Sequence, residues 1–336
     1  MVTLKDVAKK ANVSPSTVSR VMSNSKDISE NTRKKVTKIM DELGYVPNIT
    51  ARKLVTNQSN TIGLVLKTIS IEMRQNPFFT EVLTSISSVC EEKRFSTIMT
   101  TSYTSEDLLN EVKALVLSKA VDGFILLYSM ENDPIYKYLV DNEVPFVVIG
   151  KKINNDPNVM FVDNDNIEAS YNLTKYMSGL GHRSLLFLSE NNTYEVNKDR
   201  LTGFLKACKE DNIQHKYVNE VVSRDEITNL LINEDIRKNY TGIVTTDSML
   251  NLNLLSALYK LNVNIPDDIQ TCTFTDSYLS ESACPPQTVV NIYPENLGKI
   301  AAKSLLEILQ KEDAVMHSSI IPTSIIERDS TKQLKS

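Results

Sequence analysis

From residue 61 to residue 310 the sequence alternates between short apolar runs and longer amphipathic stretches. Short apolar runs suit strands that are buried on both faces, and helix-length segments between them suit crossover helices. The expected strands are Ile62–Leu66, Gly123–Tyr128, Pro145–Ile149, Leu185–Leu188, Gly242–Thr245 and Ile269–Phe274. The expected helices are Glu81–Arg94, Ser105–Ser118, Ile167–Ser178, Asp199–Asp211, Ser223–Arg237, Ser248–Leu261 and Glu295–Gln310. This order predicts an α/β body of doubly wound parallel sheets. At 336 residues, two lobes are expected rather than one.

The first 56 residues differ from this body in charge. They hold 11 Lys and Arg against 5 Asp and Glu, a net charge of +6, whereas the remaining 280 residues have a net charge of −11. A positive segment attached to a negative body indicates a polyanionic partner at one end of the chain.

The pattern at the start of the chain predicts two short helices joined by a tight turn. Thr3 followed by Asp6 is a capping-box-like start, and the apolar residues after it share one helical face as far as Ala11. Ser14 suits the N-cap of a second helix, and Pro15 suits its first position because no backbone N–H is needed there.

The second helix is expected to have one apolar and one polar face. Apolar residues recur at i, i+3 and i+4 from Val18, which leaves Ser16, Thr17 and Arg20 on the opposite face with hydrogen-bonding tips that could read base edges. The expected DNA contacts of this segment are Thr3, Ser14, Ser16, Thr17, Ser19 and Arg20.

A third helix is expected between Ser29 as its N-cap and Gly44 as its stop, with Val36, Ile39, Met40 and Leu43 on its apolar face. Three such helices could form an interaction module whose basic side chains are only a solvated face. We favour a helix-turn-helix layout, in which the second helix enters the major groove of DNA.

Four segments carry a further pattern: Leu4–Arg20, Gly44–Leu54, Leu180–Arg183, and Pro285–Val289 ahead of Leu297-Gly298. They resemble the LacI/GalR family of bacterial transcription regulators, and the similarity extends along nearly the whole chain. The first two segments together are highly specific, whereas the last two would mean little alone. The resemblance implies a periplasmic-binding-protein-like body whose chain crosses between two lobes near Met160, Val290 and Ile320.

The expected domains follow from this resemblance. Residues 1–46 would form the DNA-binding head, 47–60 the hinge helix and linker, and 61–330 the effector-binding and dimerisation body. Within the body, lobe 1 would take about 61–160 and 290–319, and lobe 2 about 161–289 and 320–330.

The hinge, Asn48 to Val55, could form about two helical turns. A helix this short with β-branched residues is marginal in water, so we expect it to be mostly unfolded without DNA. The resemblance implies that two such hinges pair on the operator and insert Leu54 into the minor groove. The expected contacts are Asn48, Ala51, Arg52 and Leu54. Without the resemblance, a plain linker would be the preferred interpretation.

The effector site is expected at the carboxyl ends of the strands, between the lobes. The positions that match the family site are Asn76, Phe78, Phe79, Tyr128, Arg200, Thr246, Asp247, Phe274, Thr275 and Asp276. Phe78 and Phe79 could equally be core residues, and Arg200 could be a surface arginine, although its fork suits hydroxyl or carboxylate groups.

Two of these positions depart from the family pattern. Thr245-Thr-Asp247 stands where many members read Ala-Asn-Asp, and Thr273-Phe-Thr-Asp276 stands where many read Gly-Phe-Asp-Asp. These departures leave the identity of the effector open.

Other apparent motifs favour no cofactor, metal or catalytic site. Gly179-Leu-Gly181 precedes a strand, the reverse of a dinucleotide fingerprint, and is expected to stop a helix. Asp163-Asn-Asp-Asn166 opens like a calcium loop but lacks the later glycine and glutamate, so turn or N-cap chemistry explains it better. The four cysteines and three histidines share no metal spacing. Without a signal peptide or a long apolar span, a cytoplasmic location with reduced thiols is expected.

Together these features predict a homodimeric transcription repressor that binds a pseudo-palindromic operator, is controlled by a small molecule and is not an enzyme. Asn76-Pro-Phe-Phe79 and Asp276-Ser-Tyr-Leu279 are most similar to the maltose-operon repressors of Gram-positive bacteria, so the expected effector is a sugar such as maltose or a maltooligosaccharide. One alternative is a catabolite-control-type regulator tuned by a phosphorylated partner protein. Another is a sugar-modifying enzyme with an added DNA-binding head.

Overall fold

The computed structural model describes residues 2–22, 25, 27–45, 58–66, 75–102, 104–153, 156, 159–190, 193–221, 223–310 and 318–334. The chain divides into two compact units, Met1–Ser59 and Asn60–Ser336, called the head and the body below. Among the described helices, none has the length and apolar character needed to cross a membrane.

The described part of the head forms three helices, α1 (Leu4–Ala11), α2 (Pro15–Met22) and α3 (Glu30–Leu43). Their bounds agree with the sequence prediction because the expected caps are present: Thr3 closes a capping box with Asp6, Ser29 caps α3, and Gly44 ends α3 in the left-handed region at φ 60°. The small core of the head is formed by Val7, Ala8, Ala11, Val18, Val21 and Val36. The hinge segment, with Asn48, Ala51, Arg52 and Leu54, lies outside the described residues.

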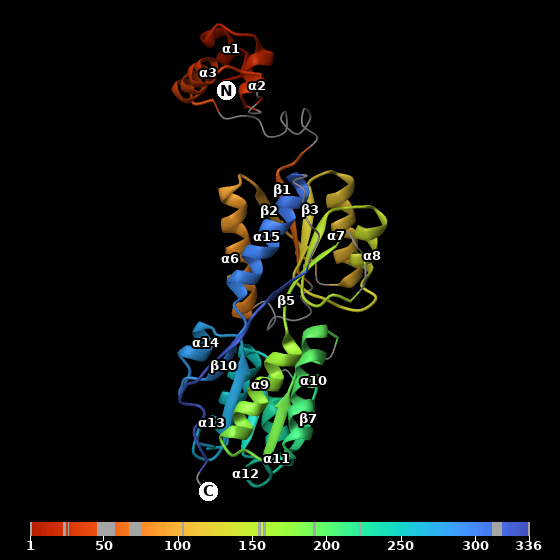
Figure 1. Ribbon diagram of the computed structural model, residues 1–336, viewed down its shortest axis with the longest axis vertical. Helices are drawn as coiled ribbons and strands as arrows, with labels where there is room; N and C mark the ends of the chain where they lie inside the picture. Colours follow the sequence, from red (N-terminus) through yellow and green to blue (C-terminus); the bar gives the residue numbers. More distant parts are fainter. Residues whose placement is uncertain are drawn as a thin grey trace. The chain divides into compact units, whose positions relative to one another are not determined.

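The body contains two six-stranded sheets, each flanked by helices, and so confirms the predicted α/β fold (Figure 1). In the first sheet, called lobe 1 with its helices, all pairs are parallel in the order β11-β5-β4-β3-β1-β2. Its strands are β1 (Thr61–Val65), β2 (Ser96–Met99), β3 (Gly123–Leu126), β4 (Phe146–Ile149), β5 (Met160–Asn164) and β11 (Ser319–Ile321). Its helices are α6 (Pro77–Glu92), α7 (Ser105–Leu117), α8 (Pro134–Asp141) and α15 (Pro294–Gln310).

The second sheet, called lobe 2 with its helices, has the order β12-β10-β9-β8-β6-β7, and only β12 runs antiparallel to its neighbour. Its strands are β6 (Ser184–Leu188), β7 (Gln214–Val218), β8 (Gly242–Thr245), β9 (Gln270–Phe274), β10 (Thr288–Asn291) and β12 (Ser324–Ile326). Its helices are α9 (Asn166–Gly179), α10 (Glu195–Glu210), α11 (Arg224–Asn233), α12 (Ile236–Asn239), α13 (Ser248–Lys260) and α14 (Tyr278–Glu281).

The six strands expected from apolar runs are all present, and one expected helix is interrupted. The segment expected to be helical from Ser223 to Arg237 forms α11 and α12, because Asp235 takes the left-handed conformation at φ 46° between them. The expected crossing positions Met160, Val290 and Ile320 fall within β5, β10 and β11, so the chain leaves each sheet a few residues later than the sequence indicated.

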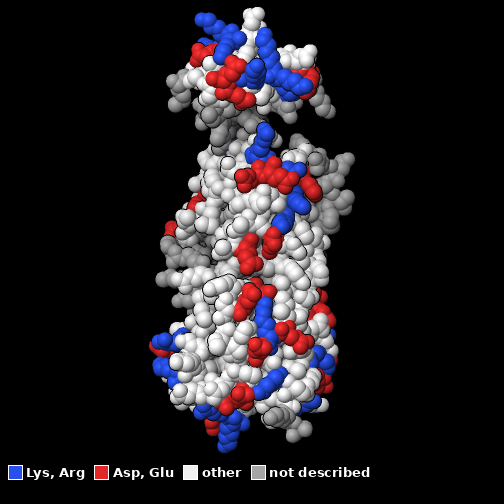
Figure 2. All heavy atoms as spheres, turned by 90° about the vertical axis from the view of Figure 1, so that its left-hand side faces the viewer, with Lys and Arg blue, Asp and Glu red and all other residues white. Residues whose placement is uncertain are grey.

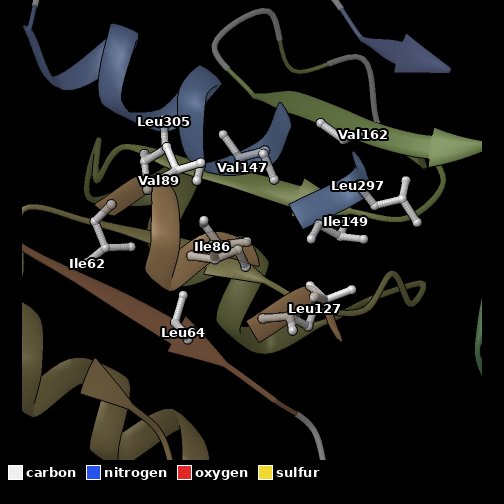
Figure 3. Packing of buried hydrophobic residues seen from close by; sticks show 14 of the residues in the cluster. Ile62, Leu64, Ile86, Val89, Leu127, Val147, Ile149, Val162, Leu297 and Leu305 are labelled. Carbon is white, nitrogen blue, oxygen red and sulfur yellow. The ribbon is translucent and has the colours of Figure 1, made fainter. Parts of the chain in front are cut away.

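The core of lobe 1 lies between its sheet and the helices α6 and α15, which pack side by side along one face (Figure 1). Figure 3 shows strand residues such as Ile62 and Val147 gathered with Ile86 and Val89 of α6 and Leu305 of α15. The helices can approach closely because α15 carries Gly298, where an added Cβ would lie 2.1 Å from the Oγ of Ser85.

Candidate DNA-binding head and effector cleft

The first turn of α2 is fixed by the hydroxyl of Ser14. The backbone N–H of Thr17 donates to this oxygen at 3.1 Å, and the hydroxyl groups of Ser16 and Thr17 lie 2.7 and 2.8 Å from it. Ser14 and Ser16 are exposed, Thr17 and Ser19 are half-buried, and Arg20 is exposed on the same helix. The structure therefore presents a row of hydroxyl groups and a guanidinium along the polar side of α2, as the helical spacing predicted.

Thr3, an expected DNA contact, is also the N-cap of α1. Its backbone N–H and its hydroxyl both donate to the carboxylate of Asp6, at 2.8 and 2.7 Å. These hydrogen bonds lower the pKa of Asp6, so the capping carboxylate stays ionised. An ion pair between Lys10 and Glu42, 3.0 Å apart, joins α1 to α3. The described basic residues of the head are Lys5, Lys9, Lys10, Arg20, Arg33, Lys34, Lys35 and Lys38.

Charge on the body has a different distribution from the charge on the head. On the face drawn in Figure 2, acidic and basic side chains of the body alternate, with uncharged surface between them. Several charged side chains of the body form ion pairs, for example Lys175 with Asp211 and Lys216 with Glu234. The described residues of the body therefore show no extended basic surface on this face.

A cleft between lobe 1 and lobe 2 is the candidate site for the effector. Eight of the ten residues that matched the family site line it: Asn76, Phe78, Phe79, Tyr128, Arg200, Thr246, Asp247 and Thr275. The first four belong to lobe 1 and the last four to lobe 2, so the cleft is assembled from segments far apart in the sequence.

Phe274 and Asp276 lie elsewhere. Phe274 is fully buried in the core of lobe 2, and the guanidinium carbon of Arg200 lies 4.2 Å from the centroid of its ring. The carboxylate of Asp276 accepts a hydrogen bond from Arg328 at 2.7 Å. Neither side chain lines the cleft.

Arg200 on α10 is the central charge of the cleft. Its Nε donates to the amide oxygen of Asn166 at 3.2 Å, and its Nη1 donates to the carbonyl oxygen of Thr246 at 2.5 Å. Burial lowers the pKa of Arg200 to about 10, against the opposing effect of Asp247 and Asp163. The side chain remains a cation at neutral pH, fixed by two hydrogen bonds and by the ring of Phe274 beneath it.

Two carboxylates, those of Asp163 and Asp247, are buried near Arg200. Burial raises the pKa of Asp163 to about 7, although the backbone N–H of Asn164 donates to it at 2.8 Å. Burial also raises the pKa of Asp247, whose carboxylate caps α13 by accepting from Met249 and Leu250. The cleft therefore offers hydrogen-bond acceptors whose charge depends on what occupies it.

Thr246 adds a hydroxyl oxygen that has no hydrogen-bond partner within the described part of the chain, although the residue is only 1% exposed. A buried polar group without a partner is costly, and a ligand with a hydroxyl group would supply the missing bond.

Sequence reasoning missed several cleft residues: Ser129, Lys151, Asp163, Asn164, Asn166, Glu190, Tyr194 and Asn197. Asp163 to Asn166 carried a signal, since they are polar residues directly after a strand, but β5 itself was not predicted. The N-cap explanation for this segment is confirmed by Asp165, whose carboxylate accepts from the N–H of Glu168 at 2.9 Å.

Asn164 joins the three crossing segments of the body. Its side-chain amide donates to the carbonyl oxygen of Ile292, which follows β10, at 3.1 Å and to that of Ile321, which ends β11, at 2.9 Å. One side chain at the end of β5 is thus bonded to both other crossings, and Asn164 and Ile292 line the cleft.

A helix-turn-helix head followed by a two-lobed, ligand-binding body defines a ligand-responsive transcription regulator. Residues 3–48 match the model of bacterial regulatory proteins of the lacI family, and residues 174–331 match that of the periplasmic binding protein-like domain. The HTH-type transcriptional regulator MalR from Staphylococcus xylosus is 44% identical over 338 residues, which cover 100% of this chain and 99% of the relative.

Solved structures agree with this assignment. A probable maltose operon transcriptional repressor from a Staphylococcus species is 41% identical, with 82% of this chain and 99% of that chain covered and a TM-score of 0.78. The lac repressor dimer bound to operator and the anti-inducer ONPF is 25% identical, with 98% and 99% covered and a TM-score of 0.81. The chain belongs to the LacI family of bacterial regulators. It is a DNA-binding transcriptional repressor with an effector-binding body, and this family consists of regulators, not enzymes.

Proposed function

We propose that this repressor acts in the cytoplasm, binds maltose or a maltooligosaccharide in its cleft and changes its affinity for operator DNA when it does so. The observation that carries the proposal is the buried guanidinium of Arg200, held by Asn166 and the backbone of Thr246 in a cleft with both aromatic and polar walls. Aromatic faces suit the C–H surface of a pyranose, and the amide, hydroxyl and carboxylate groups suit its hydroxyls. The 44% identity to MalR from Staphylococcus xylosus supports a sugar of this class.

Calorimetry of the full chain with maltose, maltotriose, cellobiose and a purine would test the effector. Saturable binding of maltose or maltotriose, with weaker binding of cellobiose, is the expected result. Binding of the purine alone would replace the sugar in the proposal. If no small molecule binds, a phosphorylated partner protein becomes the better candidate for control, and turnover of the sugar would revive the enzyme alternative.

The proposed operator is pseudo-palindromic and is bound by a homodimer. Support comes from the lac repressor, whose structure is described as a dimer bound to operator. Lobe 2 also exposes large apolar side chains on two adjoining helices: Leu252 and Tyr259 of α13 are 40% and 85% exposed, and Tyr278 of α14 is 76% exposed. A second copy of the chain would cover this surface, since exposed apolar groups of this size commonly mark interfaces.

Sedimentation of two matched variants would test this interface. Tyr259→Asp should shift the mass toward a monomer, because a charge would be buried at the centre of the contact. Tyr217→Asp is the control, since Tyr217 is 47% exposed on the edge strand β7 and the same substitution there should leave the dimer intact. Equal behaviour of the two variants would place the dimer contact elsewhere.

A further inference from the structure

Lobe 1 contains a second cavity of about 390 Å³, separate from the effector cleft. Its floor is formed by side chains of the sheet, including Leu126, Val148 and Phe161, and its wall by α8. These residues belong to the core on the face of the sheet that α7 and α8 cover, opposite to α6 and α15 (Figure 1). Among the described residues, only Tyr128 and Ser129 line both the cavity and the cleft.

The charged groups that line this cavity are mostly acidic among the described residues. Asp133, Asp141 and Asp156 line it, and among the described lining residues the one ammonium group is that of Lys137, which lies 3.2 Å from the carboxylate of Asp141. The phenol of Tyr136 donates to Asp156 at 2.6 Å. An anion would meet an excess of negative charge, whereas a ligand with hydroxyl or amino donors would find carboxylates with unused lone pairs.

The apolar part of the cavity adds a second requirement. The ring of Tyr136 is stacked with that of Phe161, with centroids 6.4 Å apart, and Leu126 and Val148 lie beside them on the floor. A ligand that fits must therefore present an apolar face as well as donors, as a pyranose or an alkyl amine does. The cavity lies within the size range of small-molecule sites.

Tyr128 links this cavity to the cleft. Its hydroxyl donates to the carboxylate of Asp133 at 2.8 Å, and that carboxylate also accepts from the first backbone N–H groups of α8. On the other side, the ring of Tyr128 makes an edge contact with Tyr194, the residue that precedes α10 of lobe 2, with centroids 6.4 Å apart. A ligand that displaces Asp133 or α8 would move a wall of the cleft.

We propose that the cavity beneath α8 is a second small-molecule site, for a non-anionic compound with hydrogen-bond donors and an apolar face, and that its occupancy changes effector affinity through Tyr128. The binding part stands on the cavity alone, whereas the coupling part rests on the proposed function of the cleft.

Calorimetry or ligand-observed NMR of the full chain tests the binding part, with glucose and inositol as polyols, putrescine as an amine, and glucose 6-phosphate as the anionic control. A polyol or the amine should bind saturably, and which one binds identifies the source of the donors. Val140→Trp, which fills the cavity from α8, should weaken this binding at least about tenfold, and Asp156→Ala on the rim should weaken it if the tryptophan variant does not fold. Binding that survives both variants, or no binding at all, would overturn the proposal.

Arg200→Ala separates the two sites. It should abolish maltose binding in the cleft and leave the cavity ligand bound, whereas Val140→Trp should do the reverse. If maltose binds to neither the Arg200→Ala nor the Val140→Trp variant, the proposed function has failed. The cavity proposal is then still tested by the binding of its own ligand.

The coupling part is tested by measuring maltose affinity with and without a saturating cavity ligand. Coupled sites typically change each other's affinity about fivefold or more. In Tyr128→Phe, which lacks the hydroxyl bonded to Asp133, the ratio of the two affinities should fall to one. A ratio of one in the parent, or an unchanged ratio in the variant, would contradict coupling through Tyr128.

Discussion

Lys151 and Asp199 form an ion pair across the cleft, with Nζ of the lysine 2.6 Å from Oδ1 of the aspartate. Lys151 follows β4 of lobe 1 and lines the effector cleft, and Asp199 lies on α10 of lobe 2, so the pair bonds one lobe to the other. The carboxylate raises the pKa of Lys151, and a second cross-lobe pair, Lys198 with Glu131, lies nearby at 3.7 Å.

Removal of this ion pair should shift the lobes toward an open arrangement. In Lys151→Met the aliphatic stem is kept and the charge is lost, so we expect a larger radius of gyration without ligand by X-ray scattering and a weaker effector affinity. Lys216→Met is the matched control, because Lys216 pairs with Glu234 at the same 2.6 Å within lobe 2. An unchanged radius and affinity in Lys151→Met would mean that the pair does not hold the lobes together.

Arg200 should be required for the response to effector. Arg200→Ala removes the cation that Asn166 and Thr246 hold in the cleft, so maltose should no longer alter operator affinity. Operator affinity without sugar should stay near that of the parent, because the head folds around a core of its own. Arg237→Ala, at a half-exposed arginine of α12, is the control, and a normal response in Arg200→Ala would remove Arg200 from the site.

The free energy of unfolding should depend on pH through Asp163. Burial raises its pKa from 3.8 to about 7, so between about pH 4 and 7 the folded state holds a proton that the unfolded chain has released. Stability must then fall as the pH rises through this window, by at most about 1.4 kcal/mol per pH unit. Asp163→Asn should flatten this part of the profile in urea titrations, whereas Asp225→Asn at an exposed carboxylate should not. If the free energy of unfolding of Asp163→Asn depends on pH as that of the parent does, this carboxyl does not hold the proton.

Arg20 should read a base edge from α2. Arg20→Ala is expected to lose about 1–3 kcal/mol of operator binding and to relax the preference at one base position in each half-site. Lys34→Ala on α3 provides the comparison, since a phosphate contact would lower affinity equally on all sequences and reduce the salt slope. If Arg20→Ala loses the same operator affinity on every operator variant, Arg20 contacts a phosphate and not a base edge.

Leu54 should act as a wedge at the centre of the operator. Leu54→Ala removes the apolar group that would hold a kinked base step open, so DNA bending and affinity should fall together, and most on operators with a stiff central step. Effector affinity and dimer mass should not change. A variant that bends and binds every operator as the parent does would show that the hinge is only a tether.

The sequence predicted six strands that are mostly buried, but it missed β5 and β10, which are mostly buried too, as well as exposed strands at the sheet edges. β2 and β7 lie at sheet edges and are mostly exposed, so they lack the continuous apolar run that marks β3 or β8. The short strands β11 and β12 form only by pairing with strands that lie earlier in the chain. β11 pairs with β5, more than a hundred residues earlier, and β12 pairs with β10, some thirty residues earlier, so no local sequence pattern predicts them.

The effector site shows the same division. Positions such as Arg200 and Thr246 could be placed by resemblance, whereas Lys151 and Asn164 could not, because their roles arise from contacts between lobes. Asp276 illustrates the limit: its carboxylate is bonded to Arg328, 52 residues further on, and the sequence around it gives no sign of that partner.

The last strands of the two sheets have a consequence for the order in which the chain can fold during synthesis. β11 completes the sheet of lobe 1 and β12 completes that of lobe 2, and both come from residues 319–326. The carbonyl oxygen of Ile321, which accepts a hydrogen bond from Asn164, also becomes available only when these residues have been synthesised. On the ribosome the head can fold first, since its core lies within the first 45 residues. Both lobes must wait for almost the entire chain, and a premature stop before residue 319 would leave both sheets incomplete at once.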